Sequence, residues 1–171
     1  MLFRSRGLTP ARLEIDAAAE VIDLGARPVA VGRRTRDLAV GAGAVGVARR
    51  ALRTSADYLQ ERHQFGRPLA RFGALQRMLV DAADRVAGAS ALLHLAAAGT
   101  SGAACSQAAR TAAEAAVAVA DDAIQLHGGY GYTTEYLPER LLRDAVTLRA
   151  IAATGRAASS SALGLFDHSL H

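Results

Sequence analysis

The chain of 171 residues contains no lysine and no tryptophan, a single cysteine and few aromatic side chains. One cysteine, Cys105, excludes an intrachain disulfide and a cysteine-rich metal site, and the histidines lack the spacing of metal ligands. Aromatic residues make up 5% of the chain and apolar residues, largely alanine, make up 51%. This composition favours closely packed helices over a β-sandwich, and the length suits one domain that folds alone.

Long apolar runs are also missing. No stretch reaches the roughly 18 uninterrupted apolar residues that a membrane helix requires, so we expect no membrane partner. The first six residues, Met1 to Arg6, lack the long apolar region of a secretory signal. We therefore expect a cytoplasmic protein.

The charge is basic, because 20 arginines outnumber 16 acidic residues and give a formal net charge of +4. A basic balance is one sign of nucleic-acid binding. In this chain the arginines are scattered and often stand beside a carboxylate, as in Arg36-Asp37 and Arg143-Asp144. We therefore expect no nucleic-acid partner.

Residues 1–34 differ from the rest and are interpreted as an irregular N-terminal arm. Residues 13–16 alternate like a short strand, and residues 17–24 fit a helix or an extended chain equally well. The stretch that follows is interrupted by three helix-breaking residues, Gly25, Pro28 and Gly32.

Helical periodicity begins near Arg36 and predicts a first helix that ends near Arg62, with Asp37 as an exposed acid in its first turn. A second helix is expected from about Ala70 to the turn at residues 99–102, and a third over about 104–127. Pro138 suits the start of a fourth helix. A weak last helix is expected over about 157–166. We predict an all-α, up-and-down four-helix bundle over residues 35–171.

The most distinctive stretch is Gln125 to Tyr132, where three glycines lie among an amide, an imidazole and two phenols. Gly128 alone explains a helix stop, since glycine readily takes the left-handed conformation just past a helix end. Three glycines with interleaved aromatic residues favour instead a groove that a flat or phosphorylated ligand approaches closely. Both interpretations stay open from these residues alone.

Three motifs, in order and at this spacing, resemble the C-terminal helical domain of acyl-CoA dehydrogenases. They are Arg62-x-Gln64-Phe65-Gly66, Gln125-Leu126-His127-Gly128-Gly129-Tyr130-Gly131-Tyr132, and Pro138-x-Arg140-Leu141-Leu142-Arg143-Asp144-Ala145. The likeness covers about Arg36 to Thr154, and residues 13–24 loosely resemble the exit of that family's middle β-domain. The resemblance implies the same bundle, an FAD shared across a subunit interface, and a homodimer or tetramer.

In that family the arginine turn and the Gln-x-x-Gly-Gly loop hold the ADP part of a flavin whose ring belongs to the neighbouring subunit. The resemblance places Arg62 at the pyrophosphate, and a guanidinium fork suits phosphate chemically. The alternative for Arg62 is an ion pair with Asp57 or Glu61. The cofactor-binding positions that the resemblance implies are Arg62, Gln64, Phe65, Gln125, Gly128, Gly129 and Thr154.

The sequence departs from the family at the catalytic base. The usual glutamate stands just before a Gly-Thr pair, where this chain has Ala152, so no catalytic residue is assigned there. A subset of the family carries the base early in the first long helix, near Arg36, which leaves Asp37 as a weak candidate. The family's N-terminal helical domain and most of its β-domain have no counterpart in these residues.

Three hypotheses follow. The first is an FAD-binding oxidoreductase subunit of fatty acid metabolism, which carries out α,β-dehydrogenation of an acyl-CoA thioester once a companion subunit supplies domains and a base. The second is a non-catalytic oligomerisation or helper module that retains the bundle. The third is a chain that covers only the C-terminal domain of a longer enzyme.

Overall fold

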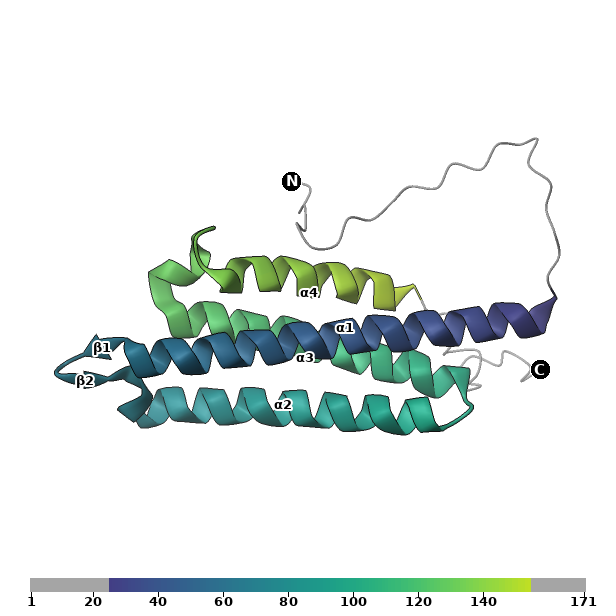
Figure 1. Ribbon diagram of the computed structural model, residues 1–171, viewed down its shortest axis with the longest axis horizontal. Helices are drawn as coiled ribbons and strands as arrows, with labels where there is room; N and C mark the ends of the chain where they lie inside the picture. The colour runs from purple at the N-terminus through teal and green to yellow at the C-terminus, as the bar shows by residue number, and fades with distance from the viewer. Residues whose placement is uncertain (1–24, 155–171) are drawn as a thin grey trace, which may run out of the picture.

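The computed structural model describes residues 25–154, and these form a bundle of four long helices (Figure 1). The helices are α1 (Ala26–Glu61), α2 (Gly73–Ala98), α3 (Gly102–His127) and α4 (Leu137–Ala153). Each runs antiparallel to the one before it, which confirms the predicted up-and-down bundle. None of the described helices is both long and apolar enough to cross a bilayer. The expected strand at 13–16 and the expected helix at 157–166 lie outside the described residues.

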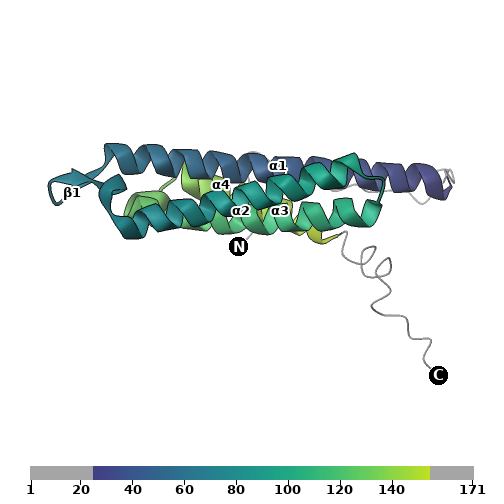
Figure 2. The ribbon, with the colours of Figure 1, turned by 90° about the horizontal axis from the view of Figure 1, so that it is seen from below.

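The parallel pair α1 and α3 forms the centre, with α2 and α4 on opposite sides of it (Figures 1 and 2). Alanine dominates this contact, and the central alanines Ala44, Ala48, Ala112 and Ala116 are at most 1% exposed. Small side chains let helix axes approach closely, because no large knob separates the two backbones. At Gly41 an added Cβ would lie 3.3 Å from the Ala109 Cα, so the two helices leave almost no space there.

Helix α1 begins ten residues before the predicted start at Arg36, and it runs across the expected boundary at residue 34. Pro28 is the third helical residue, where the N–H that proline lacks has no intrahelical partner in any helix. Gly32 costs about 1 kcal/mol relative to alanine, which the length of the helix outweighs. The expectation that these residues interrupt the helix is therefore wrong.

Two short connections lie together at one end of the bundle (Figure 1). Between α1 and α2, strands β1 (His63–Gln64) and β2 (Arg67–Pro68) pair as a small hairpin, and the 3₁₀ turn η1 (Leu69–Arg71) follows. Between α3 and α4 lies a second 3₁₀ segment, η2 (Gly128–Tyr132). The two motifs singled out in the sequence thus reach the same end because α1 and α3 are parallel.

Candidate functional site

Arg62 and the glycine-rich segment face each other at the hairpin end. The Arg62 guanidinium carbon lies 5.7 Å from the centre of the Tyr130 ring in η2, a cation–π geometry. One turn before the end of α1, the Tyr58 hydroxyl donates to the His127 carbonyl oxygen at 3.4 Å. The structure therefore brings Arg62 next to η2, and Tyr58 connects α1 to the end of α3.

The hairpin presents Phe65 to solvent. Its side chain is 90% exposed, and its φ of 53° places a bulky residue in the left-handed region, followed by Gly66 at 77°. Positive φ at both turn positions is the pattern of a tight two-residue hairpin. For a residue with a side chain it costs on the order of 1–3 kcal/mol. Gln64 precedes this turn and is also exposed.

The three glycines of η2 have different reasons. Gly128 has φ 59° and ψ −138°, a backbone conformation that side chains disfavour. Gly131 is buried, and a Cβ there would lie 2.6 Å from the Ile124 oxygen. Gly129 has a negative φ and open space where a Cβ would stand, so nothing in the described chain requires a glycine. Its backbone is open to close approach by a ligand.

His127 is the last residue of α3 and is only 3% exposed. Its ring stacks on Tyr58 with centroids 4.2 Å apart and meets the edge of Tyr136 at 6.3 Å. Nδ1 lies 2.7 Å from the Ala123 oxygen, and because a carbonyl only accepts, Nδ1 carries the proton. Burial lowers the pKa of His127, and the bond to Ala123 opposes this with a smaller upward effect. The ring is therefore neutral at pH 7 and belongs to the packing between α1, α3 and α4.

Residues 62–66 and residues 125–129, together called the clamp, lie at the hairpin end of the bundle, and all of them except Leu126 and His127 are exposed. Arg62 and Gln125 are both exposed. Within the described chain, Arg62 makes no ion pair with Asp57 or Glu61, and Tyr130 is its ring contact. A guanidinium with exposed N–H groups beside open backbone suits an anionic, planar ligand.

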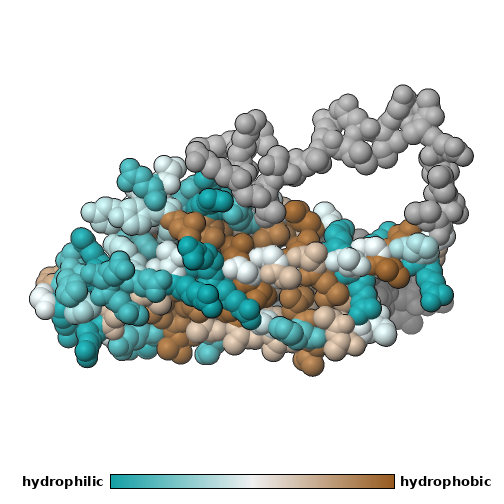
Figure 3. Space-filling model, in the orientation of Figure 1, coloured by the Kyte–Doolittle hydropathy of each residue, from teal (hydrophilic) through white to brown (hydrophobic). Residues whose placement is uncertain are grey.

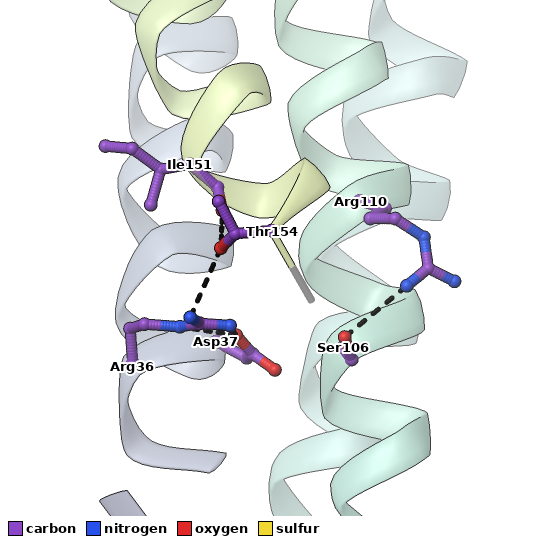
Figure 4. A network of polar contacts seen from close by, with 6 residues as sticks. All are labelled: Arg36, Asp37, Ser106, Arg110, Ile151 and Thr154. Carbon is purple, nitrogen blue, oxygen red and sulfur yellow. Dashed lines mark hydrogen bonds and ion pairs between the residues drawn. The ribbon is translucent and has the colours of Figure 1, made fainter. Parts of the chain in front are cut away.

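A cluster of polar side chains lies where the end of α4 packs against α1 (Figure 4). The Arg36 guanidinium donates from Nε and Nη2 to the same Asp37 oxygen, at 2.9 and 2.6 Å, and from Nη1 to the Thr154 hydroxyl at 3.2 Å. The Thr154 hydroxyl in turn donates to the Ile151 oxygen at 2.7 Å. Arg36 therefore links the two family positions for a base, one on α1 and the other just before Thr154.

Asp37 differs from the sequence expectation. It is the twelfth residue of α1 and only 6% exposed, so its interpretation as an exposed acid of the first turn is wrong. Ala152 is 4% exposed and lines a hollow of about 230 Å³ between α3 and α4, shared with Arg110, Glu114 and Arg149. The two candidate base positions lie at the same end of the bundle, and the Asp37 carboxylate already forms an ion pair with the Arg36 guanidinium.

Thr154 lies apart from the other predicted cofactor positions. It follows the end of α4, whereas Gly128 and Gly129 precede its start, so the 17 residues of α4 separate them. At about 1.5 Å per residue this is about 25 Å within one chain. Arg62 meets the glycine-rich segment at Tyr130, whereas Thr154 lies with Arg36 at the far end of α4.

Sequence reasoning missed the contacts that organise both places. Tyr58, Tyr136 and the bridging role of Arg36 received no prediction. The aromatic identity of Tyr58 four residues before Arg62 was a usable signal, since residues four apart share a helix face. Nothing in the sequence alone indicated that Arg36 reaches Thr154 across 118 positions.

Residues 34–155 match the family described as "Acyl-CoA dehydrogenase, C-terminal domain". An acyl-CoA dehydrogenase of Bacillus subtilis is 42% identical over 113 residues, covering 63% of this chain and 30% of that protein. The 3-sulfinopropanoyl-CoA desulfinase of Paraburkholderia xenovorans is 37% identical over 156 residues, covering 82% of this chain and 40% of that protein.

The fold has solved counterparts as well. Butyryl-CoA dehydrogenase from Megasphaera elsdenii superposes with a TM-score of 0.74 at 27% identity, over 80% of this chain and 38% of that one. The chain therefore spans about a third of the length of the relatives that it matches, and its helices occupy their C-terminal part.

Proposed function

Because this chain belongs to the acyl-CoA dehydrogenase family through its C-terminal domain, we propose that it binds the ADP part of an FAD. The chain would take part in the α,β-dehydrogenation of an acyl-CoA thioester, while another polypeptide supplies the remaining domains and the base. Family members are FAD flavoproteins. The observation that carries the proposal is the clamp, in which Arg62 faces η2 beside the open backbone of Gly129.

The residues present fit the cofactor's ADP part. Arg62 would meet the pyrophosphate, because a guanidinium forms paired, charge-assisted hydrogen bonds with phosphate oxygens. Gly128 and Gly129 would offer backbone on the opposite side, and the exposed ring of Phe65 offers an apolar surface beside it. When bound, FAD supplies the acceptor for the β-hydrogen of the substrate.

The base is the part that this chain does not provide in the family's usual form. Ala152 has no titratable group, and Asp37 is held by two nitrogens of Arg36. The α-proton of a thioester is weakly acidic, so a positioned carboxylate contributes roughly two to four orders of magnitude in rate. We therefore expect the described residues to hold and orient the cofactor, and proton removal to need a carboxylate from elsewhere.

A companion acyl-CoA dehydrogenase subunit is the partner proposed for this purpose. Apolar side chains gather over the middle of the face shown in Figure 3, while hydrophilic residues cover the hairpin end. Large exposed apolar patches on a folded protein mark interaction surfaces. The relatives carry more than half of their length outside the matched domain, which is enough chain to cover such a face. A cytoplasmic location stays a prediction.

The alternative function is a non-catalytic oligomerisation module, and one observation favours it. Val80 and Leu95 on α2 are 57% and 71% exposed. At Gly88, which lies between them along the helix, an added Cβ would meet no described atom within 4 Å. When two copies cover such a face, the burial of each large side chain stabilises the contact by about 1.5–3 kcal/mol. We expect a homodimer or tetramer.

We expect Leu95→Glu to weaken self-association at least tenfold, because the carboxylate must be desolvated in the contact. Sedimentation velocity over a range of chain concentrations measures this. Gln107→Glu, which adds the same charge at an exposed site on α3, is the control and should leave association unchanged. A wild-type chain that sediments as a monomer throughout the range would contradict the module.

Replacing Arg62 with alanine tests the clamp, with ADP as the probe. Losing charge-assisted hydrogen bonds of about 1.5–3 kcal/mol should raise the ADP Kd about 10- to 100-fold. Isothermal titration at low salt measures the change. The melting temperature should stay within a few degrees of wild type, because Arg62 is exposed.

The matched control is Arg53→Ala, which removes an exposed arginine from the same helix about two turns earlier. It alters the net charge equally, so a similar loss of ADP affinity in both variants would mean that only bulk charge matters. Equal losses of affinity and of folding stability in Arg62→Ala would instead assign the residue to structure.

A further inference from the structure

An aromatic chain joins the two sides of the clamp through His127. Tyr58 of α1 stacks on the His127 ring, Tyr136 meets its edge, and Tyr130 of η2 lies 5.3 Å from Tyr136. Arg62 then lies over Tyr130. One buried imidazole therefore sits at the contact of three helices, with η2 beginning at the next residue.

The surroundings of the His127 ring disfavour a second proton. The groups that face it are the rings of Tyr58 in α1 and of Tyr136 just before α4, and the cation Arg62 lies beyond Tyr130. Glu135, the carboxylate next to Tyr136, is exposed. Nδ1 already donates to Ala123, so a further proton must go to Nε2 of a ring that is 3% exposed. An imidazolium without a partner there is costly to bury.

We propose that protonation of His127 releases η2 from the end of α3 and thereby separates the two sides of the clamp in mildly acidic conditions. Opening lets the imidazolium reach water, so acid favours the open form. This inference rests on the proposed function only for its consequence, the release of an ADP-containing ligand. The opening itself is a property of the chain alone.

The sign follows from linkage. Burial depresses the pKa of His127 below its unfolded value of about 6.5, so the open form binds more protons between the two values. The stability of the closed form is complete above pH 6.5 and is lost as the pH falls below it. The opening constant therefore rises up to about tenfold for each pH unit below about 6.5, until the pKa of the closed form is reached.

Amide hydrogen exchange of the apo chain tests the inference. The Gly128 amide donates to the Gln125 oxygen and the Thr133 amide to the Tyr130 oxygen, so both report on η2. Their protection factors should fall several-fold between pH 7 and pH 5. The Gly99 amide, which donates to the Leu95 oxygen at the other end of the bundle, should keep its protection factor.

His94 provides a matched control. Its Nδ1 lies 2.6 Å from the Ser90 oxygen, the same bond to the preceding turn that His127 makes, yet it is exposed. His94→Gln should leave the pH dependence at η2 unchanged. His127→Phe keeps an aromatic ring but cannot ionise, so its η2 protection should not change with pH.

If His127→Phe disturbs folding, Tyr58→Phe serves as the second variant. It keeps the stacked ring and removes only the hydrogen bond to the His127 oxygen, so the acid-induced fall at η2 should remain, at lower overall protection. Protection at Gly128 and Thr133 that stays constant from pH 7 to pH 5 in wild type would overturn the inference. A pH-dependent η2 without ADP binding would instead fault the proposed function alone.

Discussion

Replacing Gly131 with alanine should lower the free energy of unfolding by about 2–3 kcal/mol, the cost of forcing an extra methyl group into a packed site. The new Cβ would lie 2.6 Å from the Ile124 oxygen, 2.9 Å from its Cα and 3.1 Å from its carbonyl carbon. All three are backbone atoms of α3, so no side chain can rotate away. The strain must move η2 as a whole. Urea unfolding followed by circular dichroism measures the change.

Gly129→Ala is the control two residues earlier. A Cβ there meets nothing within 4 Å, and the backbone φ is negative, so we expect a change in unfolding free energy within about 0.5 kcal/mol. The same variant should weaken ADP binding, because the methyl group would take up space beside the backbone that we propose the ligand approaches. Equal destabilisation by the two variants would contradict the separation of structural and binding glycines in η2.

Ala152→Glu should raise the rate of substrate oxidation by roughly two to four orders of magnitude in a flavin-loaded complex whose companion subunit has had its own catalytic carboxylate replaced by the amide. The position is the family's base position, and it lines the hollow shared with Arg110 and Arg149. The guanidinium groups of Arg110 and Arg149 favour the charged carboxylate, while Glu114, which pairs with Arg149 at 3.6 Å, opposes them. The loss of visible flavin absorbance after mixing with acyl-CoA gives the rate.

Ala150→Glu is the matched control, because this exposed residue lines the same hollow and receives the same charge. A comparable rate increase in both variants would show that general charge, and not position, is responsible. Asp37→Asn tests the other candidate. If the Asp37→Asn variant loses the activity that the wild-type complex shows, then Asp37 is the base, and the base does not act from the position of Ala152.

The bundle was predictable because its signals are local. Leu59 and Val45, spaced at whole heptads, are buried as expected, and Pro138 stands in the first turn of α4. The grouping of Arg62 with η2 was predictable only through the family resemblance. No local pattern states that α1 and α3 end side by side.

What escaped prediction depends on contacts between distant residues. Pro28 and Gly32 suggested an early break, yet both lie inside α1. Pro28 stands in the first turn, which needs no N–H partners from within the helix, and the length of the helix outweighs the cost of Gly32. The sequence indicated a surface acid at Asp37, whereas the folded chain buries this residue and pairs it with Arg36. The neutral, buried state of His127 likewise requires Tyr58 and Tyr136, which lie 69 and 9 positions away.

Helix α4 also sets a distance. Its 17 residues separate the glycine-rich segment from Thr154 by about 25 Å, and its flanks are fixed against α1 and α3. The length of α4 therefore fixes the position of Ala152, because one inserted or deleted residue would shift it by about 1.5 Å along the helix axis and rotate it by about 100° around that axis. Length variation is consequently not tolerable between Pro138 and Ala152.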